Sequence, residues 1–403
     1  MTKKSDTPAI RFKGFTDTWE QRKAKELFVS TADKGYPELP VLSATQDRGM
    51  IRRDENSINI FHDKKNEAGY KRVLPGQFVI HLRSFQGGFA HSTIEGITSP
   101  AYTVFGFSEP EKHDSEYWKY VFTSKSFIRR LETVTYGIRD GRSISYEEFL
   151  TLGFVYPSKA EQKAIARYLD KLSDLITLHQ RKYDKLTNVK KSMLEKMFPK
   201  NGSNVPEIRF KGFTEAWEQR KLGELADIVG GGTPSTGVSD FWDGDIDWYV
   251  PAEIAEQIYL TSSQRKITEE GYNHSSAKML PVGTVLFTSR AGIGKTAILT
   301  RKGCTNQGFQ SIVPHKGELD SYFIFSRTEE LKQYGETVGA GSTFVEVSGK
   351  QMANMELMMP KTMAEQKIIG QYFANLDHLI TLHQRELEKL KNIKKSCLEN
   401  MFV

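Results

Sequence analysis

The sequence predicts an α+β protein that repeats one plan twice: two domains of mixed α/β type joined by two long antiparallel coiled-coil helices, with an internal pseudo-twofold repeat. Three observations predict this fold. Two segments recur almost unchanged, a heptad pattern runs through the longer of them, and strand-like and helix-like stretches alternate in the segments between. A chain of 403 residues has room for several domains of ordinary size.

The shorter recurring segment stands near the start of each half, and we call its two copies the head segments. Residues 10–23 match residues 208–221 at 12 of 14 positions. The longer segment, residues 161–198, matches residues 365–402 at 23 of 38 positions. A polar joint rich in Pro, Gly and Asn, residues 199–207, separates the halves. Each half is therefore a head segment, a variable middle segment and a long repeat.

Each long repeat is expected to form one helix. Ser158 with Glu161, and Thr362 with Glu365, match the S/T-x-x-E capping box. Apolar residues then step by four and three, a period that indicates a coiled coil. These positions are Ile165, Leu169, Leu172, Ile176, Tyr183, Leu186, Met193 and Met197, and again Ile369, Phe373, Leu376, Ile380, Leu387, Leu390, Cys397 and Met401. The polar seam residues are His179, Lys190, His383 and Lys394. Because the chain must return between the helices, we expect them to be antiparallel.

The two middle segments are predicted to be divergent versions of one mixed α/β fold. The expected strands are residues 56–61, 77–83, 101–107, 284–289 and 310–314, and the expected helices are 115–134 and 320–338. The predicted boundaries are a head at 1–28, a first middle domain at 29–157, a long helix at 158–198, the joint at 199–207, a second head at 208–226, a second middle domain at 227–360 and a long helix at 361–403.

Composition sets limits on the class of protein. The chain is 38% hydrophobic with a mean hydropathy of −0.49 and no run of 18 apolar residues, which excludes a membrane helix. Its start lacks an apolar signal-type stretch, and two cysteines cannot make a disulfide framework, so a reducing, cytoplasmic location is expected. The net charge is +6, but the middle segments hold none of that excess, so charge alone does not predict nucleic-acid binding.

Motifs that suggest an enzyme have simpler explanations. The stretch Ser289–Thr296 resembles a phosphate loop, but Ser289 stands where the Walker A motif needs glycine. Residues 161–163 and 365–367 read Glu-Gln-Lys, the tail of a nuclease motif, but the capping box accounts for both glutamates. His and Cys show no metal-ligand spacing. We therefore predict no catalytic residue, no cofactor and no metal site.

Two unlike modules held at a fixed spacing suit a target with two separated parts, such as duplex DNA read at two half-sites. A scaffold that binds protein partners could use the same geometry. The alternative function is therefore a coiled-coil adaptor whose middle domains bind proteins rather than DNA.

The repeated residues resemble a known family. The head pattern I-R-F-x-G-F-x-x-x-W and the helix that begins Glu-Gln-Lys are similar to those of the specificity subunit of type I restriction–modification enzymes. Four motifs of the second middle segment resemble a common target-recognition-domain pattern: residues 230–235 (GGGTPS), 241–248 (FWDGDIDW), 289–295 (SRAGIGK) and 305–309 (TNQGF). The first middle segment lacks the Gly-Gly-Thr-Pro motif and matches this pattern less well.

The resemblance implies a division of labour. The middle segments, as target recognition domains 1 and 2, would each read one half of a bipartite double-stranded DNA site. The helices would act as spacer and dock two methyltransferase subunits, which two restriction subunits would join. Adenine methylation, S-adenosylmethionine binding, ATP-driven translocation and DNA cleavage would belong to those partners, and the specificity subunit itself would be non-catalytic.

We expect DNA contacts in the loops of both middle segments. The candidates in the first are Arg83, Ser84, Gln86, Arg139 and Arg142, and those in the second are Thr233, Ser289, Arg290, Lys295, Ser342 and Thr343. Arg can pair bidentately with guanine and Gln with adenine, while Lys more often meets phosphate. A structural ion pair for Arg83 and plain surface turns for the Gly-rich loops are the alternatives. Trp19 and Trp217 are expected to anchor the core.

Overall fold

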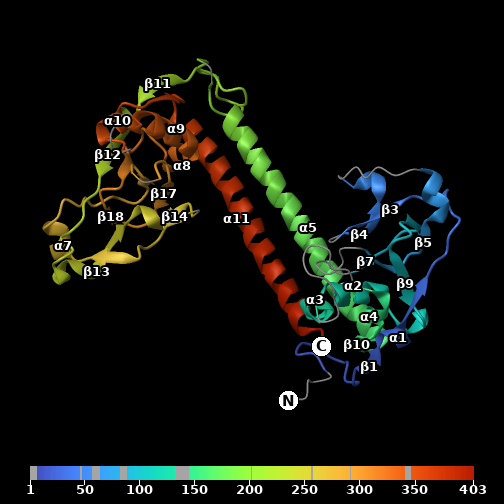
Figure 1. Cartoon of the computed structure of the whole chain (residues 1–403). Coiled ribbons are helices and arrows are strands. Elements are labelled where there is room, and N and C mark those ends of the chain that lie inside the picture. The colour runs from blue at the N-terminus through green and yellow to red at the C-terminus, as the bar shows by residue number, and fades with distance from the viewer. Residues whose placement is uncertain are drawn as a thin grey trace. The chain divides into compact units, whose positions relative to one another are not determined.

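The computed structural model describes residues 7–45, 48–56, 64–81, 89–132, 145–200, 202–255, 257–290, 292–340 and 346–403. The chain divides into two compact units (Figure 1). The first unit holds Met1–Gln180 and Arg385–Val403, and the second holds Arg181–Gln384. Each of the two long helices therefore contributes one half to each unit.

The first unit is built around a four-stranded sheet of order β2-β9-β6-β7, in which all neighbours are antiparallel. Two further antiparallel pairs are β3 with β4 and β5 with β8, while β1 of the head segment pairs with β10. The elements before the long helix are β1 (Glu20–Lys23), α1 (Ala24–Leu27), β2 (Phe28–Thr31), β3 (Leu42–Thr45), β4 (Gly49–Arg52), β5 (Lys71–Val73), β6 (Phe78–Ile80), β7 (Ala90–His91), β8 (Gly96–Thr98), β9 (Thr103–Phe107), α2 (Ser115–Thr123), α3 (Lys125–Glu132), α4 (Tyr146–Leu150) and β10 (Gly153–Tyr156).

The second unit contains a five-stranded sheet of order β12-β19-β16-β17-β14 and a three-stranded sheet of order β15-β13-β18. Its head strand β11 pairs with β20, as β1 pairs with β10. The elements are β11 (Glu218–Lys221), α6 (Leu222–Leu225), β12 (Ala226–Gly230), β13 (Trp242–Tyr249), β14 (Tyr259–Leu260), β15 (Arg265–Ile267), α7 (Glu269–Asn273), β16 (Val285–Phe287), β17 (Thr296–Leu299), β18 (Cys304–Thr305), β19 (Gln310–Pro314), α8 (Ser321–Ser326), α9 (Thr328–Gly339), α10 (Gly349–Ala353) and β20 (Glu356–Met359).

The two main sheets share one strand order, with β2, β9, β6 and β7 matching β12, β19, β16 and β17. Gly76 and Gly283 strengthen the match, because each lies two residues before its strand with φ +86°, a left-handed conformation that favours glycine. The shared order supports the prediction that the two middle segments are versions of one fold.

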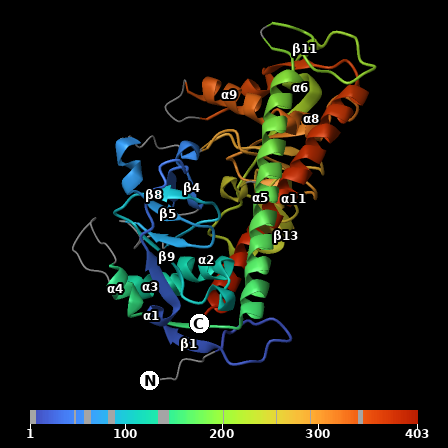
Figure 2. The ribbon, with the colours of Figure 1, turned by 90° about the vertical axis from the view of Figure 1, so that its right-hand side faces the viewer.

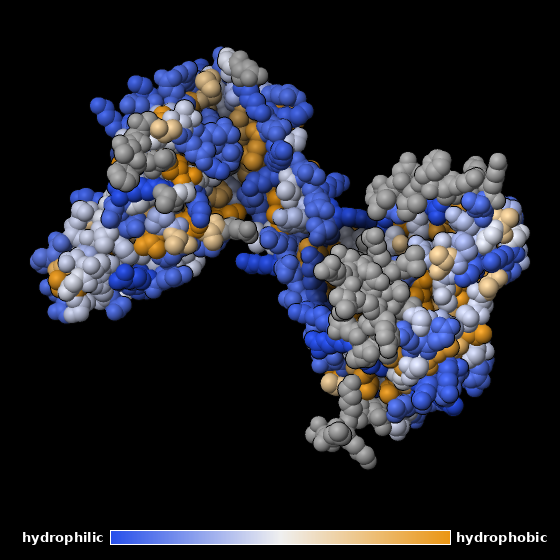
Figure 3. Space-filling view, viewed as in Figure 1, coloured by the Kyte–Doolittle hydropathy of each residue, from blue (hydrophilic) through white to orange (hydrophobic). Residues whose placement is uncertain are grey.

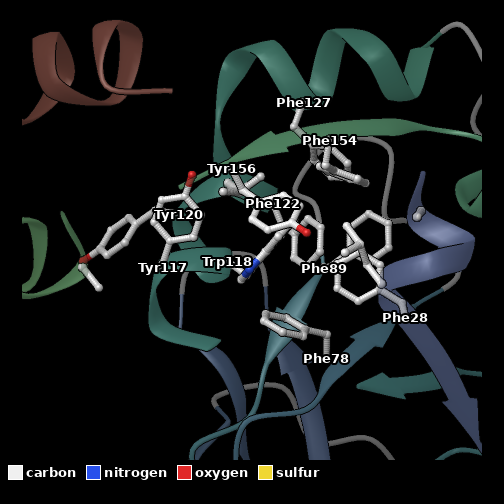
Figure 4. Close-up of a cluster of buried hydrophobic side chains, with 14 of the residues drawn as sticks. Phe28, Phe78, Phe89, Tyr117, Trp118, Tyr120, Phe122, Phe127, Phe154 and Tyr156 are labelled. Carbon is white, nitrogen blue, oxygen red and sulfur yellow. The ribbon is translucent and has the colours of Figure 1, made fainter. Parts of the chain in front are cut away.

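Aromatic side chains fill the core of the first unit, between its main sheet and helices α2 and α3 (Figure 4). The ring centroids of Phe28 and Trp118 lie 5.2 Å apart, and those of Phe78 and Phe122 lie 4.9 Å apart. Such edge-to-face contacts stabilise a core beyond the area that they bury. Trp19 and Trp217 are buried, which confirms them as core anchors.

The predicted strand at 310–314 is confirmed as β19, and those at 284–289 and 101–107 are confirmed as the shorter β16 and β9. Of the strand predicted at 77–83, β6 forms the described part; residues 82–83, like 57–61 of the first predicted strand, lie outside the described residues.

Each middle helix is broken where the sequence predicted one continuous helix. In the first unit Ser124 separates α2 from α3: its Oγ donates to the Val121 carbonyl at 2.7 Å and accepts from the Phe127 N–H at 3.2 Å. In the second unit Arg327 separates α8 from α9, and its buried guanidinium donates to the Met358 carbonyl at 2.7 Å. The prediction of single helices at 115–134 and 320–338 was wrong. The sequence pattern did not reveal the breaks, because the spacing of apolar residues continues unchanged across Ser124 and Arg327.

The long helices are α5 (Lys159–Lys196) and α11 (Met363–Asn400), close to the predicted ranges. In the first unit Lys394 donates to Ser173 at 2.9 Å, and Cys397 lies in one hydrophobic cluster with Leu169 and Leu172. In the second unit Lys190 pairs with Asp377 at 2.5 Å, and the ring of Phe198 stacks on that of Phe373. Within each unit the two helices are therefore side by side and antiparallel (Figure 2).

The capping-box explanation of the two glutamates was wrong. The Glu161 carboxylate accepts two hydrogen bonds from Arg11, at 2.7 Å and 2.8 Å, and Glu365 accepts the same pair from Arg209. Only part of a box remains at α11, where the Glu365 N–H donates to the Thr362 hydroxyl at 3.3 Å. The carboxylates turn to the head segments because the β1–β10 and β11–β20 pairs place those segments beside the helix starts.

The glutamine that follows each glutamate makes a second connection. The side-chain oxygen of Gln162 accepts from the Asp114 N–H at 2.9 Å, and that of Gln366 accepts from the Asp320 N–H at 3.0 Å. Asp114 and Asp320 are the N-caps of α2 and α8. The Glu-Gln-Lys motif thus ties the head segment and the middle domain to the start of the long helix.

Among the described residues, no helix combines the length and the apolar character needed to cross a bilayer. On the face that Figure 3 shows, hydrophilic residues cover much of the described surface.

Candidate nucleic-acid interface

The motif at residues 289–295 forms the tip of the β16–β17 hairpin. The Thr288 N–H donates to the Lys295 carbonyl at 2.9 Å, and the Lys295 N–H donates to the Thr288 hydroxyl at 2.9 Å. Gly292 and Gly294 turn the chain with φ values of +87° and +95°. A strand follows the tip, whereas a Walker A loop leads into a helix, so the geometry excludes a phosphate loop of that kind.

Two more of the motifs, and the segment at Val347, are joined to this tip directly or through one another. The Ser289 N–H donates to the Gly308 carbonyl at 2.8 Å, which fastens the tip to the loop at 305–309. The Gly232 N–H donates to the Thr305 carbonyl at 2.9 Å, which brings in the loop at 230–235. The Val347 N–H donates to the Ser289 carbonyl at 3.0 Å. Loops from four separate stretches of the sequence thus form one surface, which we call the loop surface.

The glycines of these motifs have a packing role. A Cβ atom on Gly231 would lie 2.0 Å from the Asn306 carbonyl oxygen, and one on Gly308 would lie 2.7 Å from a ring carbon of Pro251. Both distances are far below van der Waals contact. The glycines therefore allow the loops to pack closely against each other.

Of the second-segment candidates, Thr233, Ser289, Arg290 and Lys295 are described. Arg290 and Lys295 are exposed and Thr233 is partly exposed on the loop surface. Ser289 is fully buried, with its backbone bonded to Gly308 and Val347, so it positions the tip and does not present its hydroxyl to a ligand. The remaining candidates lie outside the described residues: Arg83, Ser84, Gln86, Arg139, Arg142, Ser342 and Thr343.

Arg290 forms an ion pair with Glu346, at 2.7 Å. The side chains are 46% and 36% exposed, and pairs of such exposure contribute roughly 0–1 kcal/mol. A guanidinium held this weakly can exchange its carboxylate for a phosphate or for the edge of a guanine. The ion pair with Glu346 orients the Arg290 side chain on the loop surface and leaves the guanidinium able to bind another anion.

The strand order relates the first-segment candidates to this tip. Residues 81–89 stand between β6 and β7 in the sequence, as residues 288–295 stand between β16 and β17; of the former, residues 82–88 lie outside the described residues. Seven residues after Gly76 and Gly283 stand Arg83 and Arg290 respectively. In the sequence, Arg83 therefore has the same position relative to Gly76 and β6 as Arg290 has relative to Gly283 and β16.

Sequence reasoning missed two side chains of the loop surface. Gln307 is exposed within the quoted 305–309 motif, so that motif itself was the available signal. Lys332 of α9 packs against the hairpin tip, since a Cβ atom on Gly294 would lie 2.3 Å from its Cγ. No sequence pattern indicates Lys332, because it approaches from a helix 38 residues away.

Burial raises the pKa of the Cys304 thiol to about 12, so this cysteine stays protonated at neutral pH and is a poor nucleophile. Within the described ranges, no group of three or more His, Cys, Asp and Glu side chains has a geometry that could hold a metal ion.

The known proteins that this chain resembles are all of one kind. Residues 214–392 match the type I restriction modification DNA specificity domain. The type I restriction enzyme MjaIX specificity subunit of Methanocaldococcus jannaschii is 35% identical over 192 residues, 46% of this chain and 44% of that protein. The chain thus spans less than half of that relative. The putative MjaX specificity subunit of the same organism is 22% identical over 406 residues, 95% of this chain and 92% of that protein.

A solved structure shows the same fold over the whole chain. The S subunit of a type I restriction–modification system from M. genitalium matches with a TM-score of 0.55 and 14% sequence identity, and the match covers 98% of this chain and 99% of that one. The matched specificity domain, the named relatives and the duplicated head and helix segments agree: the chain is similar to type I restriction–modification specificity subunits, most strongly in its second half.

Proposed function

We propose that the chain is the DNA-recognition subunit of a type I restriction–modification complex and that each unit reads one half of a bipartite target. The observation that supports this proposal is the shared strand order of the two sheets. In the sequence an arginine, Arg83 or Arg290, follows shortly after each of the equivalent strands β6 and β16. We keep the predicted limits of 29–157 and 227–360 for target recognition domains 1 and 2.

The two half-sites differ in sequence on this proposal. Residues 83–88 read Arg-Ser-Phe-Gln-Gly-Gly, whereas residues 290–295 read Arg-Ala-Gly-Ile-Gly-Lys. Base edges are read by side chains in the major groove, so loops with different side chains select different bases. Residues 137–143 and 339–343 remain proposed as Gly-rich phosphate-contacting loops.

The long helices offer a surface for protein partners. The heptapeptide Leu-Ile-Thr-Leu-His-Gln-Arg occurs at 175–181 and again at 379–385. Its two leucines are exposed in both copies, by 42% and 45% for Leu175 and Leu178, and by 40% and 45% for Leu379 and Leu382. Exposed large apolar side chains at matching places favour two copies of one partner. We propose that they dock two methyltransferase subunits, which two restriction subunits join.

Catalysis would then belong to the partners, and this chain would supply only recognition and assembly. The proposed complex methylates adenine and cleaves DNA with ATP-driven translocation, through active sites that the partner subunits carry.

A selection from a randomised duplex pool tests the proposal, with the full chain bound to its methyltransferase partner. Enrichment of two short motifs at a fixed gap supports bipartite reading. A complex that forms but retains duplexes without regard to sequence contradicts it and favours the adaptor alternative.

A further inference from the structure

We propose that Gln307 reads a base in the half-site of the second unit, that the base is an adenine, and that Thr233 is the positioning residue for the Gln307 carboxamide. This inference rests on the proposed DNA recognition and deepens it.

The first argument is the contrast between Gln307 and its surroundings. The side chain of Gln307 is exposed, while the neighbouring Thr305 and Phe309 are buried. The loop backbone is fixed by hydrogen bonds on both sides of Gln307: the Asn306 N–H donates to the Tyr249 carbonyl at 3.0 Å, and the Gly308 carbonyl accepts from the Ser289 N–H at 2.8 Å. When the backbone on both sides is already held by hydrogen bonds, binding through the exposed amide costs less ordering of the loop.

The second argument is the orientation of the carboxamide. The Thr233 hydroxyl donates to the Gln307 side-chain oxygen at 2.5 Å, across 74 residues of sequence. This bond distinguishes the oxygen end of the amide from the nitrogen end, and the oxygen has a second lone pair available. The amide can therefore present one donor and one acceptor side by side, which is the pattern that pairs with N7 and N6–H of adenine in the major groove.

The third argument separates Gln307 from the amide next to it. The Asn306 side-chain oxygen accepts from the Gly308 N–H at 2.9 Å and thereby closes its own loop, and the residue is half-buried. Asn306 explains the shape of the loop. No such backbone bond is formed by the Gln307 carboxamide in the described structure, where its oxygen accepts from the Thr233 hydroxyl.

The fourth argument is the charge nearby. The Ser289–Gly308 bond brings the hairpin tip, with exposed Arg290 and Lys295, against the loop of Gln307. Lys332 packs on the same tip. Cations beside a single outward amide fit the usual division in which phosphate contacts orient the protein and base contacts select the sequence.

The test is a duplex-pool selection by the assembled complex carrying wild-type chain, Gln307→Ala, Gln307→Glu or the control Gln333→Ala. Gln333 is an exposed glutamine of α9, apart from the loops. We expect Gln307→Ala to weaken the preference for adenine at one position by about 5- to 150-fold, as expected for one bidentate pair, with every other position unchanged. We expect Gln307→Glu to move the preference at that position toward cytosine, whose N4–H donates to a carboxylate. Gln333→Ala should select the wild-type motif.

Thr233→Val removes the donor and keeps the shape. It should reduce the same preference at the same position, and Thr233→Ser should restore it. If the wild-type chain selects two motifs and the Gln307 variants select them unchanged, or the altered position is not an adenine, the inference is overturned while the proposed function stands. If the wild-type chain selects no motif, the proposed function fails first.

Discussion

Arg209 donates to both carboxylate oxygens of Glu365, at 2.6 Å and 2.8 Å, and Arg11 makes the same two bonds to Glu161 in the other unit. The hydrogen bonds to the carboxylates raise the pKa of both guanidinium groups. The Glu365 side chain is 2% exposed and that of Arg209 is 12% exposed. The two recurring segments of the sequence therefore hold each other through a nearly buried ion pair.

Removing one partner of this buried ion pair should destabilise the second unit. Glu365→Gln leaves the Arg209 charge uncompensated, and we expect the free energy of unfolding of the second unit to fall by about 3 kcal/mol. Urea denaturation measures this change. The matched control is Glu215→Gln, an exposed residue 3.9 Å from Lys361, which should change stability by about 0.5 kcal/mol or less. Equal effects of the two substitutions would contradict the role of the buried pair.

The helix contact in the second unit depends on a carboxylate that the first unit lacks. Asp377 accepts from Lys190 and from the Tyr322 hydroxyl, at 2.5 Å and 2.9 Å, whereas Ser173 stands at the matching place beside Lys394. Asp377→Ser should destabilise the second unit by about 2 kcal/mol, because Lys190 loses its charged partner and one hydroxyl oxygen replaces the two carboxylate oxygens that accept from Lys190 and Tyr322. Asp174→Ser, at an exposed position, is the control in the same denaturation experiment. A loss no larger than that of the control would contradict this role of Asp377.

Exposed leucines should govern assembly without affecting folding. Leu178→Glu and Leu382→Glu each place a charge in one copy of the repeated heptapeptide, and thermal unfolding of the chain alone should stay nearly unchanged. Native mass spectrometry should show two methyltransferase subunits on the wild-type chain, one on either single variant and none on the double variant. Full occupancy on the double variant would place docking elsewhere.

Substitutions of Lys295 and Arg290 should have different effects on DNA binding, because we expect Lys295 to contact phosphate and Arg290 to contact a base. Lys295→Ala should weaken DNA binding by a similar factor for all sequences and reduce the slope of log affinity against log salt by about 1. Arg290→Ala should relax selectivity at one position of the half-site. Binding titrations at several salt concentrations, with target and scrambled duplexes, measure both. An unchanged slope for Lys295→Ala would exclude its contact with phosphate.

Acid should destabilise the first unit through His91. Burial lowers the pKa of His91 below its usual 6.5, although Glu116 and, farther away, Asp114 and Asp170 oppose the shift, and Lys119 adds to it. The unfolded chain therefore takes up the proton first, so the stabilisation is complete above about pH 6.5 and is lost as pH falls toward the lowered pKa. His91→Phe should flatten this dependence in denaturation curves from pH 7 to 5.

The control for the His91 experiment is His315, whose pKa is shifted in the opposite direction. The hydrogen bond to Asp227 raises the pKa of His315, so its stabilising effect is present at low pH and is lost as pH rises through the raised pKa. His315→Gln should not flatten the acid dependence. If His91→Phe leaves the curves unchanged, His91 is not the group that titrates.

Patterns within one stretch of sequence were sufficient for much of the fold. The long helices, β19 and the buried Trp19 and Trp217 all follow from repeats or periodicity. Contacts between distant residues were not predictable in this way. The partner of Glu161 is Arg11, 150 residues earlier, and the capping-box pattern gave a sufficient local explanation that turned out wrong.

At the candidate site, too, local motifs were predictable from the sequence and contacts between distant residues were not. The motifs of the second middle segment were recognisable in the sequence, but their meeting at one surface depends on bonds such as that between Gly232 and Thr305. The burial of Ser289 was also invisible, because a serine between an apolar strand and a Gly-rich tip fits either a buried or an exposed position.

On the loop surface, the residues that maintain the backbone are distinct from those that face outward. Gly231 and Gly308 admit no larger side chain, whereas Gln307, Arg290 and Lys295 project from the loops that these glycines allow to pack. The outward residues can thus be exchanged without rebuilding the loops beneath them. On the proposed function, such a chain would acquire a new DNA target by a few point substitutions while its fold stays the same.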